Sequence, residues 1–150
     1  MAAMTVPASA DYGEARQHEV RKFRMTMNDG NLTANTETLE AGSSARVLNG
    51  GYWGFASVPS MDAAAGEKVA RKAADNASAM GGFGKRGLDI ADGIHSGEYG
   101  FNGRPPMTQA ERVELLEALN SVCRQKFPDL RSSQFMLHEE SHAKRYLTTN

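Results

Sequence analysis

The sequence predicts an α+β fold, in which a mostly antiparallel sheet packs on an Ala-rich helix and is followed by a second helix and a terminal strand pair. Three observations predict it. Residues 11–58 alternate strand-like runs with Gly-containing turns. Residues 61–80 repeat small apolar residues at helical spacing, and residues 107–150 change from a helical pattern to a strand-like one.

The first strands follow from side-chain alternation and turn chemistry. Residues 23–27 alternate apolar with polar side chains, as a half-buried strand does. An Asn-Asp-Gly turn follows at 28–30, and an Asn-Gly-Gly turn at 49–51 leads into a strand at 52–58. The Thr-rich residues between the turns favour a strand, which we expect to bend near residues 41–42.

The third strand is expected to be central, with Trp53 in the core and Tyr52 on the wet face. Pro59 ends this strand because proline has no N–H to donate to a ladder. Ser60 is the expected N-cap of the helix at residues 61–80. A face of small residues on this helix suits close packing against a sheet.

The Gly-rich residues 81–106 predict a connector, with a short strand near residues 88–90. Residues 82–87 match the pattern G-x-G-x-x-G, but a dinucleotide site needs a strand before the pattern and a helix after it. A helix precedes the pattern here, so a flexible connector is the better interpretation. The leader, residues 1–10, is predicted to be disordered.

The second helix begins at a capping box, because Thr108 precedes Glu111 by three residues. Cys123 on its apolar face is expected to be a buried, inert thiol. Residues 133–137 and 144–149 then predict two strands around a polar turn. The predicted apolar face of the helix comprises Val113, Leu116, Leu119 or Asn120, Cys123 and Phe127.

Composition narrows the function classes. The chain has 150 residues and a net charge of −1, which argues against sequence-independent nucleic-acid binding. Its single cysteine cannot form an internal disulfide, and a cytoplasmic protein is the natural interpretation. No apolar run is long enough to cross a membrane. We therefore expect no direct nucleic-acid binding and no membrane association.

The clearest catalytic pattern is His138-Glu139-x-x-His142. In zinc peptidases, two His one helical turn apart bind Zn²⁺ and the Glu acts as general base. That spacing works only on a helix, whereas the flanking residues predict strands. We therefore expect a hairpin tip at 138–142 and assign no catalytic, cofactor-binding or metal residue. His18 and His95 stand alone in the sequence and suggest no metal cluster.

The order of these elements resembles the amino-terminal domain of the TldD/PmbA family, the modulators of DNA gyrase. The resemblance is most specific at residues 50–57, Gly-Gly-Tyr-Trp-Gly-Phe-Ala-Ser, and weakest at 81–106. It also covers the Ala-rich helix. The other matching segments are residues 11–16, 28–32, 44–48, 108–128 and 145–150.

This resemblance implies a family of cytoplasmic zinc metallopeptidases that process or degrade peptides and work as dimers. It implies that the family's zinc site, a His-Glu-x-x-x-His helix with a later Cys ligand, lies in a carboxy-terminal domain that we expect this chain to lack. Residues 138–142 are one residue too short to match that motif. No catalytic residue is therefore carried over, and zinc is implied for the other domain alone.

The predicted organisation is a leader at 1–10, a TldD/PmbA-like domain at 11–80, a connector at 81–106, and a helix plus strand pair at 107–150 that ends before the catalytic domain. The chain is expected to be inactive alone. Its predicted role is dimer assembly with a TldD/PmbA-type subunit, identical or related, and access of the peptide substrate. An exposed sheet edge could hold an extended peptide by strand addition.

Two alternatives remain open. The first is a small stand-alone zinc hydrolase that uses His138, Glu139 and His142, and it requires a helix over residues 136–147. The second is a free-standing interaction module.

Overall fold

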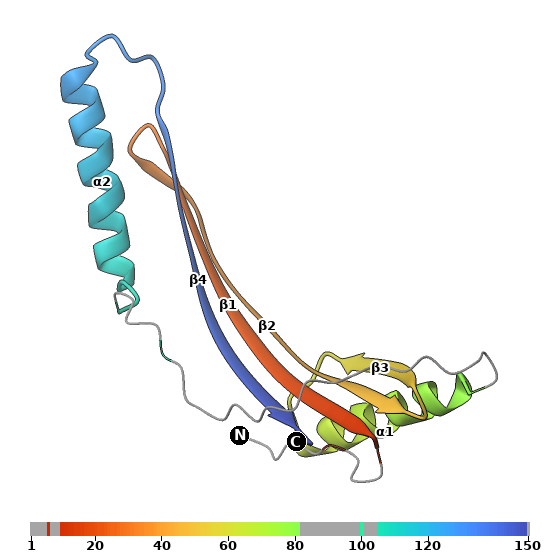
Figure 1. Ribbon diagram of the computed structural model, residues 1–150. Coiled ribbons are helices and arrows are strands. Elements are labelled where there is room, and N and C mark those ends of the chain that lie inside the picture. The colour runs from red at the N-terminus through yellow and green to blue at the C-terminus, as the bar shows by residue number, and fades with distance from the viewer. Residues whose placement is uncertain (1–5, 7–9, 82–99, 101–104, 150) are drawn as a thin grey trace. The chain divides into compact units, whose positions relative to one another are not determined.

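The computed structural model describes residue 6, residues 10–81, residue 100 and residues 105–149. Its strands form a four-stranded sheet in the order β3-β2-β1-β4 (Figure 1). This architecture confirms the predicted α+β class. The elements are β1 (Tyr12–Asn28), β2 (Asn31–Asn49), β3 (Tyr52–Val58), α1 (Ala63–Ala79), α2 (Gln109–Lys126) and β4 (Gln134–Thr148).

Two tight turns connect the first three strands. Asp29 and Gly30 have φ of 49° and 81°, and Gly50 and Gly51 have φ of 58° and 86°. Positive φ at both central residues is typical of a type I′ turn, whose twist matches that of the flanking strands. β2 and β3 accordingly pair antiparallel. Both predicted turns are confirmed, and β3 ends at Val58, directly before Pro59.

Two predicted interruptions are absent. β2 is continuous, so the bend predicted near residues 41–42 is wrong. β4 is also continuous, so the terminal strand pair with its polar turn is wrong. In β4 the predicted turn is polar and largely exposed, and polar side chains suit an exposed strand as well as a turn. In β2 the half-buried Gly42 allows close approach of β3, because a Cβ there would lie 2.9 Å from the carbonyl oxygen of Val58. β3 lies at an edge of the sheet, not at its centre as predicted.

The chain folds into two compact units, and the long strands contribute to both. The first unit contains β1 to Val20, β2 from Glu40, β3, α1, and β4 from His142. The second contains β1 from Arg21, β2 to Leu39, α2, and β4 to Ser141. Each unit has its own core.

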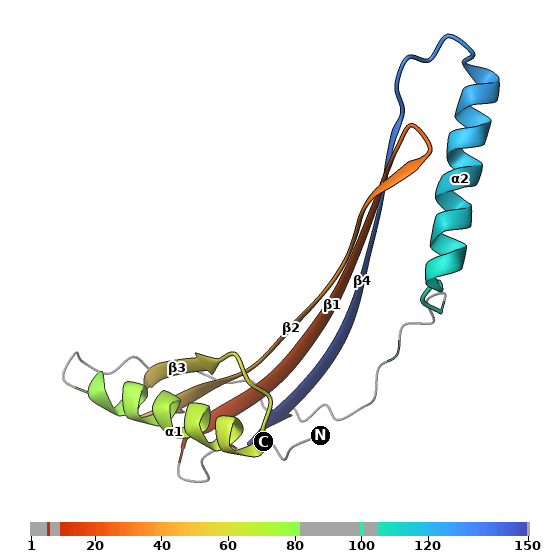
Figure 2. The same ribbon diagram turned by 180° about the vertical axis from the view of Figure 1, so that it is seen from behind.

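In the first unit, α1 packs on the sheet through small residues, and Figure 2 shows it in front of β2 and β3. A Cβ on Gly54 of β3 would lie 2.0 Å from the carbonyl oxygen of Ala73, so the helix backbone nearly touches the strand. The predicted small-residue face is thus confirmed. The core consists of Ala45, Val47, Val69, Ala70 and Ala73.

The start of α1 differs from the prediction. Asp62 is the N-cap, and its carboxylate accepts a hydrogen bond from the N–H of Ala65 at 2.6 Å. Ser60 is therefore not the N-cap. Its hydroxyl donates to the Asp62 carboxylate at 2.7 Å, so it supports the cap from two residues upstream.

In the second unit, α2 begins at the predicted capping box of Thr108 and Glu111. Leu116 is the residue that α2 buries, against Phe23, Met25 and Met27 of β1. The predicted face is confirmed at Val113, which packs against the same cluster, and at Asn120 and Cys123, which are half-buried. Leu119 is 43% exposed and Phe127 is 61% exposed, so Asn120 and not Leu119 belongs to this face, and the prediction for Phe127 is wrong. The Cys123 thiol is half-buried, not buried as predicted.

Several predictions lie outside the described residues. These are the pattern at 82–87, the short strand near 88–90, His95, and most of the leader and connector. Among the helices that the structure describes, none has the length and apolar character needed to cross a membrane.

Candidate functional site

The zinc-peptidase motif lies on an extended strand, because His138, Glu139 and His142 all belong to β4. Side chains alternate along a strand, so Glu139 lies on the opposite face from both histidines. The helix that the zinc-hydrolase alternative requires is therefore not formed. Across the described residues, no group of three or more His, Cys, Asp and Glu side chains is placed to hold a metal ion.

Glu139 has a structural partner in the second unit. Its carboxylate accepts a charge-assisted hydrogen bond from Nε of Arg112 on α2. The Arg112 guanidinium also lies 3.7 Å from the centre of the Phe23 ring. Both charged side chains are mostly buried, at 15% and 27% exposure. The contact holds α2 on the sheet, which is a different role from that of a general base.

His142 meets His18 in the first unit, so the prediction that His18 stands alone is wrong. Nε2 of His18 lies 3.1 Å from Nδ1 of His142. The ring planes differ by 20° and the ring centres are 5.3 Å apart, so the nitrogens face each other nearly in line. This geometry suits a shared proton, whereas two ligands of one metal ion must converge on a third point. Desolvation, Lys144 and His142 lower the pKa of His18.

A buried carboxylate is the most unusual feature of the first unit. The side chain of Glu14 on β1 is 4% exposed. Two tyrosine hydroxyls donate to it, from Tyr146 on β4 and, at 3.3 Å, from Tyr12. Two guanidiniums also donate, from Arg46 at 2.8 Å and Arg16 at 3.2 Å. Buried charge is stable only when it is paired and hydrogen-bonded, as it is here.

These contacts set the protonation states. Burial raises the pKa of Glu14, but the Tyr146 hydroxyl and the guanidiniums of Arg46 and Arg16 together hold it below its ordinary value. Burial and the hydrogen bond to Glu14 raise the pKa of Tyr146. At neutral pH, Glu14 is therefore a carboxylate and Tyr146 a neutral phenol that donates to it.

Aromatic rings fix both guanidiniums in place. Arg46 lies 4.4 Å from the centre of the Trp53 ring, and Arg16 lies 5.1 Å from that of Tyr146. Tyr12 meets the Trp53 ring edge-on at 5.8 Å. Trp53 is half-buried, so the prediction of a core tryptophan is wrong. The ring stands on an edge strand and covers Arg46, which stabilises the cation without burying it.

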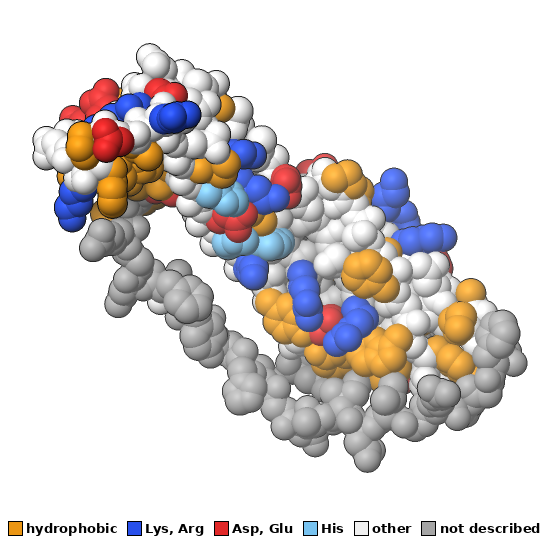
Figure 3. All heavy atoms as spheres, turned by 90° about the horizontal axis from the view of Figure 1, so that it is seen from above, with side chains coloured by type: hydrophobic (Ala, Val, Ile, Leu, Met, Phe, Trp, Pro, Cys, Tyr) orange, Lys and Arg blue, Asp and Glu red, His pale blue; other side chains and the backbone are white. Residues whose placement is uncertain are grey.

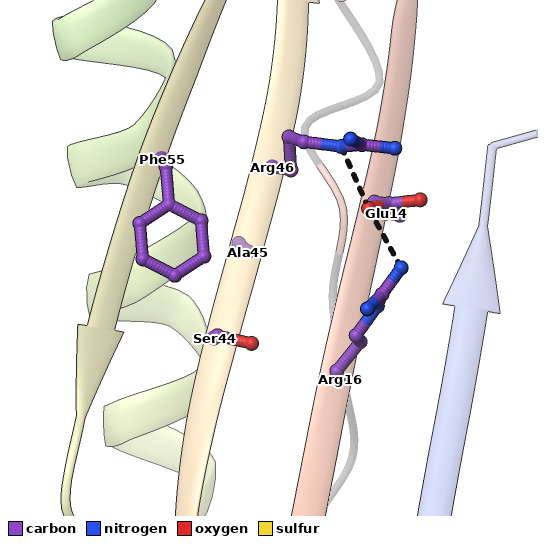
Figure 4. Close-up of a pocket in the computed structure, with 6 residues that line it drawn as sticks. All are labelled: Glu14, Arg16, Ser44, Ala45, Arg46 and Phe55. Atoms are coloured by element: carbon purple, nitrogen blue, oxygen red, sulfur yellow. Dashed lines mark hydrogen bonds and ion pairs between the residues drawn. The ribbon is translucent and has the colours of Figure 1, made fainter.

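The Glu14 cluster borders a pocket of about 220 Å³, shown in Figure 4. Both guanidiniums point toward Glu14, and Phe55 stands on the β3 side with 59% of its surface exposed. Figure 3 shows Lys and Arg side chains around an acidic one, with hydrophobic side chains beside them. The pocket is lined by Glu14, Arg16, Ser44, Ala45, Arg46 and Phe55.

Two guanidiniums against one carboxylate leave a net positive charge beside an exposed ring. This combination can accept an anionic group that carries an apolar neighbour, because guanidinium pairs well with carboxylate. No motif in the sequence points to this site. In the sequence, Tyr12, Glu14 and Arg16 alternate with smaller residues. This alternation is equally typical of a strand face that is exposed to solvent.

Comparison with known proteins gives the family. The profile described as PmbA/TldA metallopeptidase domain 1 matches residues 13–78, a range that spans β1, β2, β3 and nearly all of α1. Residues 13–78 form an amino-terminal domain of the TldD/PmbA family. The predicted family resemblance is thus confirmed.

Solved structures share this TldD/PmbA fold. A candidate modulator of DNA gyrase from Thermotoga maritima has a TM-score of 0.68 at 16% identity, over 92% of this chain and 31% of that one. TldE from Thermococcus kodakarensis has a TM-score of 0.61 at 17% identity, over 93% of this chain and 32% of TldE. A candidate modulator of DNA gyrase from Bacteroides thetaiotaomicron has a TM-score of 0.63 at 11% identity, over 95% of this chain and 33% of that one.

At these identities the likeness shows the fold alone. The chain spans about a third of the length of each of these solved structures. The comparison with curated proteins found no match.

Proposed function

We propose that this chain is the non-catalytic amino-terminal part of a TldD/PmbA-like zinc metallopeptidase that processes or degrades peptides. In this role it serves dimer assembly and access of the peptide substrate. The match of residues 13–78 to the first domain of the family supports the assignment. The zinc ion that the family implies does not fit the described residues, because they place no three ligands together.

The pocket at Glu14 is the observation that carries the role in substrate access. An extended peptide could place a carboxylate, either its carboxyl terminus or an acidic side chain, against Arg16 and Arg46. An apolar side chain next to that carboxylate would contact Phe55. Because Glu14 and the aromatic rings already orient both guanidiniums, binding orders few additional side-chain torsions.

Trp53 provides a direct test, because it is the single tryptophan of the chain and lies against Arg46. We expect saturable changes in its fluorescence on titration with a short peptide that ends in an apolar residue and a free carboxylate. The same peptide with an amidated carboxyl terminus should bind at least tenfold more weakly. Equal binding of the two peptides would contradict the proposed pocket.

A matched pair of variants locates the binding site. Arg46→Gln removes one guanidinium of the pocket and should weaken binding of the free-acid peptide at least tenfold. Arg71→Gln removes an exposed guanidinium from α1 in the same unit and should leave binding unchanged. Calorimetry should give the same ranking, independently of any change in Trp53 emission that Arg46→Gln causes directly.

The non-catalytic assignment has its own test. Metal analysis and peptidase assays on the purified chain should give no stoichiometric zinc and no cleavage. Tight zinc binding with cleavage that His138→Ala abolishes would overturn the assignment and support the stand-alone zinc hydrolase.

A further inference from the structure

Helix α2 exposes a row of apolar side chains on a different side from its buried Leu116. Leu115 is 38% exposed, Leu119 43% and Val122 48%. Their spacing of four and three residues places them on one helical face, and the exposed Ala118 lies among them. We call these four residues the α2 stripe. Apolar side chains exposed next to one another on one helical face make a candidate contact surface.

The α2 stripe is symmetric about its own midpoint, which lies between Ala118 and Leu119. Leu115 and Val122 are equally far from that midpoint in the sequence. Glu111 at one end and Lys126 at the other are also equally far from it, and both are exposed. When a second α2 helix is laid against the first in the opposite direction, the apolar residues of the two stripes therefore face each other. The acidic end of each helix then faces the basic end of the other.

This pattern is self-complementary in one orientation only. In an antiparallel pair of α2 helices, Leu115 meets the second copy's Val122. Glu111, whose carboxylate also accepts from Thr108 in the capping box, then lies near the second copy's Lys126. In a parallel pair, Glu111 would meet the same acidic residue of the second copy, which is repulsive. An isologous two-fold contact requires this match of a surface with itself.

We propose that the α2 stripe binds a second copy of this chain, with the two α2 helices antiparallel and the two-fold axis between Ala118 and Leu119. This inference rests on the proposed role in dimer assembly and assigns a surface to it. The small Ala118 side chain at the axis permits close approach of the helices. One helix pair is a small interface, so the dimer dissociates on dilution.

Sedimentation of the full chain over a range of concentrations tests the surface. The unaltered chain should show a monomer–dimer equilibrium, and Leu119→Glu should raise the dissociation constant at least tenfold. Leu39→Glu is the matched control, because Leu39 is also in the second unit and is 57% exposed, but lies on β2. It should leave the dissociation constant unchanged. Circular dichroism verifies that both variants are folded.

Disulfide trapping tests the orientation. In a Cys123→Ser background, a chain with Leu115→Cys is mixed with a chain with Val122→Cys under mild oxidation. The antiparallel register brings these two thiols together, so the mixture should form several times more cross-linked dimer than either chain alone. Within either chain alone, the two copies of the new thiol would lie about 10 Å apart along the helix axis, too far for a disulfide.

The outcomes separate the two proposals. A chain that dimerises but is insensitive to Leu119→Glu, or that cross-links equally well without mixing, overturns the α2 stripe as the contact and leaves the proposed role in assembly standing. A chain that stays monomeric at every concentration overturns both the stripe contact and self-assembly. The peptide titration with Trp53 reports on substrate access independently of either result.

Discussion

The two units each place one helix on the sheet, but they hold it by different means. In the first unit, α1 buries Ala65, Gly66, Val69, Ala70, Ala73 and Ala77, and its backbone nearly touches Gly54. In the second, α2 buries Leu116 and adds the ion pair of Arg112 with Glu139. Small residues thus bind one helix over its whole length, whereas one large residue anchors the other and leaves apolar surface free for a partner.

The largest expected effect comes from breaking the close contact in the first unit. Gly54→Val places a side chain where the Ala73 carbonyl oxygen and the Ala77 nitrogen already lie, at 2.0 and 2.4 Å from an ideal Cβ. Because backbone cannot move aside as a side chain can, we expect a loss of about 3 kcal/mol in the free energy of unfolding. Urea denaturation measures it. Gly100→Ala is the control, since no atom lies within 4 Å of its added Cβ.

The second unit should respond most to Leu116→Ala. This change empties the one fully buried position of α2 and should cost about 2 to 3 kcal/mol, from lost burial and a cavity. Leu119→Ala on the same helix should cost about 0.5 kcal/mol or less, because that side chain is largely exposed in the monomer. Similar losses for the two variants, measured by denaturation at low protein concentration, would refute the single-anchor description of α2.

The buried carboxylate of the first unit gives a pH dependence. Folding lowers the pKa of Glu14, so its contribution is fully present above its unfolded pKa of about 4.3 and is lost as pH falls through the lower folded pKa. Glu14→Gln should reduce stability at pH 7 by about 1.5 kcal/mol and flatten the decline below pH 5. Glu37→Gln removes an exposed carboxylate paired with Arg21 and should leave that decline unchanged.

The smallest effect is expected from the ion pair of the second unit. A double-mutant cycle of Arg112→Ala and Glu139→Gln should give a coupling energy of about 1 kcal/mol, because both side chains are mostly buried but still reach solvent. Arg112→Lys should recover only part of the loss, since an ammonium group cannot reproduce the planar contact with Phe23. Full recovery would show that charge alone, without the ring contact, holds α2.

The features that the sequence predicted correctly are local. The Asp-Gly and Gly-Gly turns, the capping box at Thr108 and the small face of α1 each depend on residues close together in the chain. A bend was mispredicted in β2 because Gly42, which suits a bend, instead allows β3 to approach closely. The extent of β4 was mispredicted because its exposed section carries polar residues that also suit a turn. Burial of one strand face, which normally reveals a strand, is missing there.

The Glu14 cluster could not be predicted because it depends on the pairing of β1 with β4. Glu14 and Tyr146 are 132 residues apart, and His18 and His142 are 124 apart. No local pattern in either strand identifies the other as its neighbour. A glutamate in a polar stretch of sequence is also expected to be exposed to solvent. Its burial is explained only by the two tyrosine hydroxyls and two guanidiniums that donate hydrogen bonds to it.

One consequence follows from the continuity of β1. Ala15 and Gln17 in the first unit, and Phe23, Met25 and Met27 in the second, occupy odd-numbered positions, whereas the buried Glu14, Val20 and Thr26 occupy even-numbered ones. Deleting a single residue near Val20 would turn every later side chain to the opposite side, which would remove the methionines from the cluster with Leu116 and place Arg24 there. Deleting two residues would preserve this parity. Among natural relatives, length changes within this strand should therefore occur in even steps.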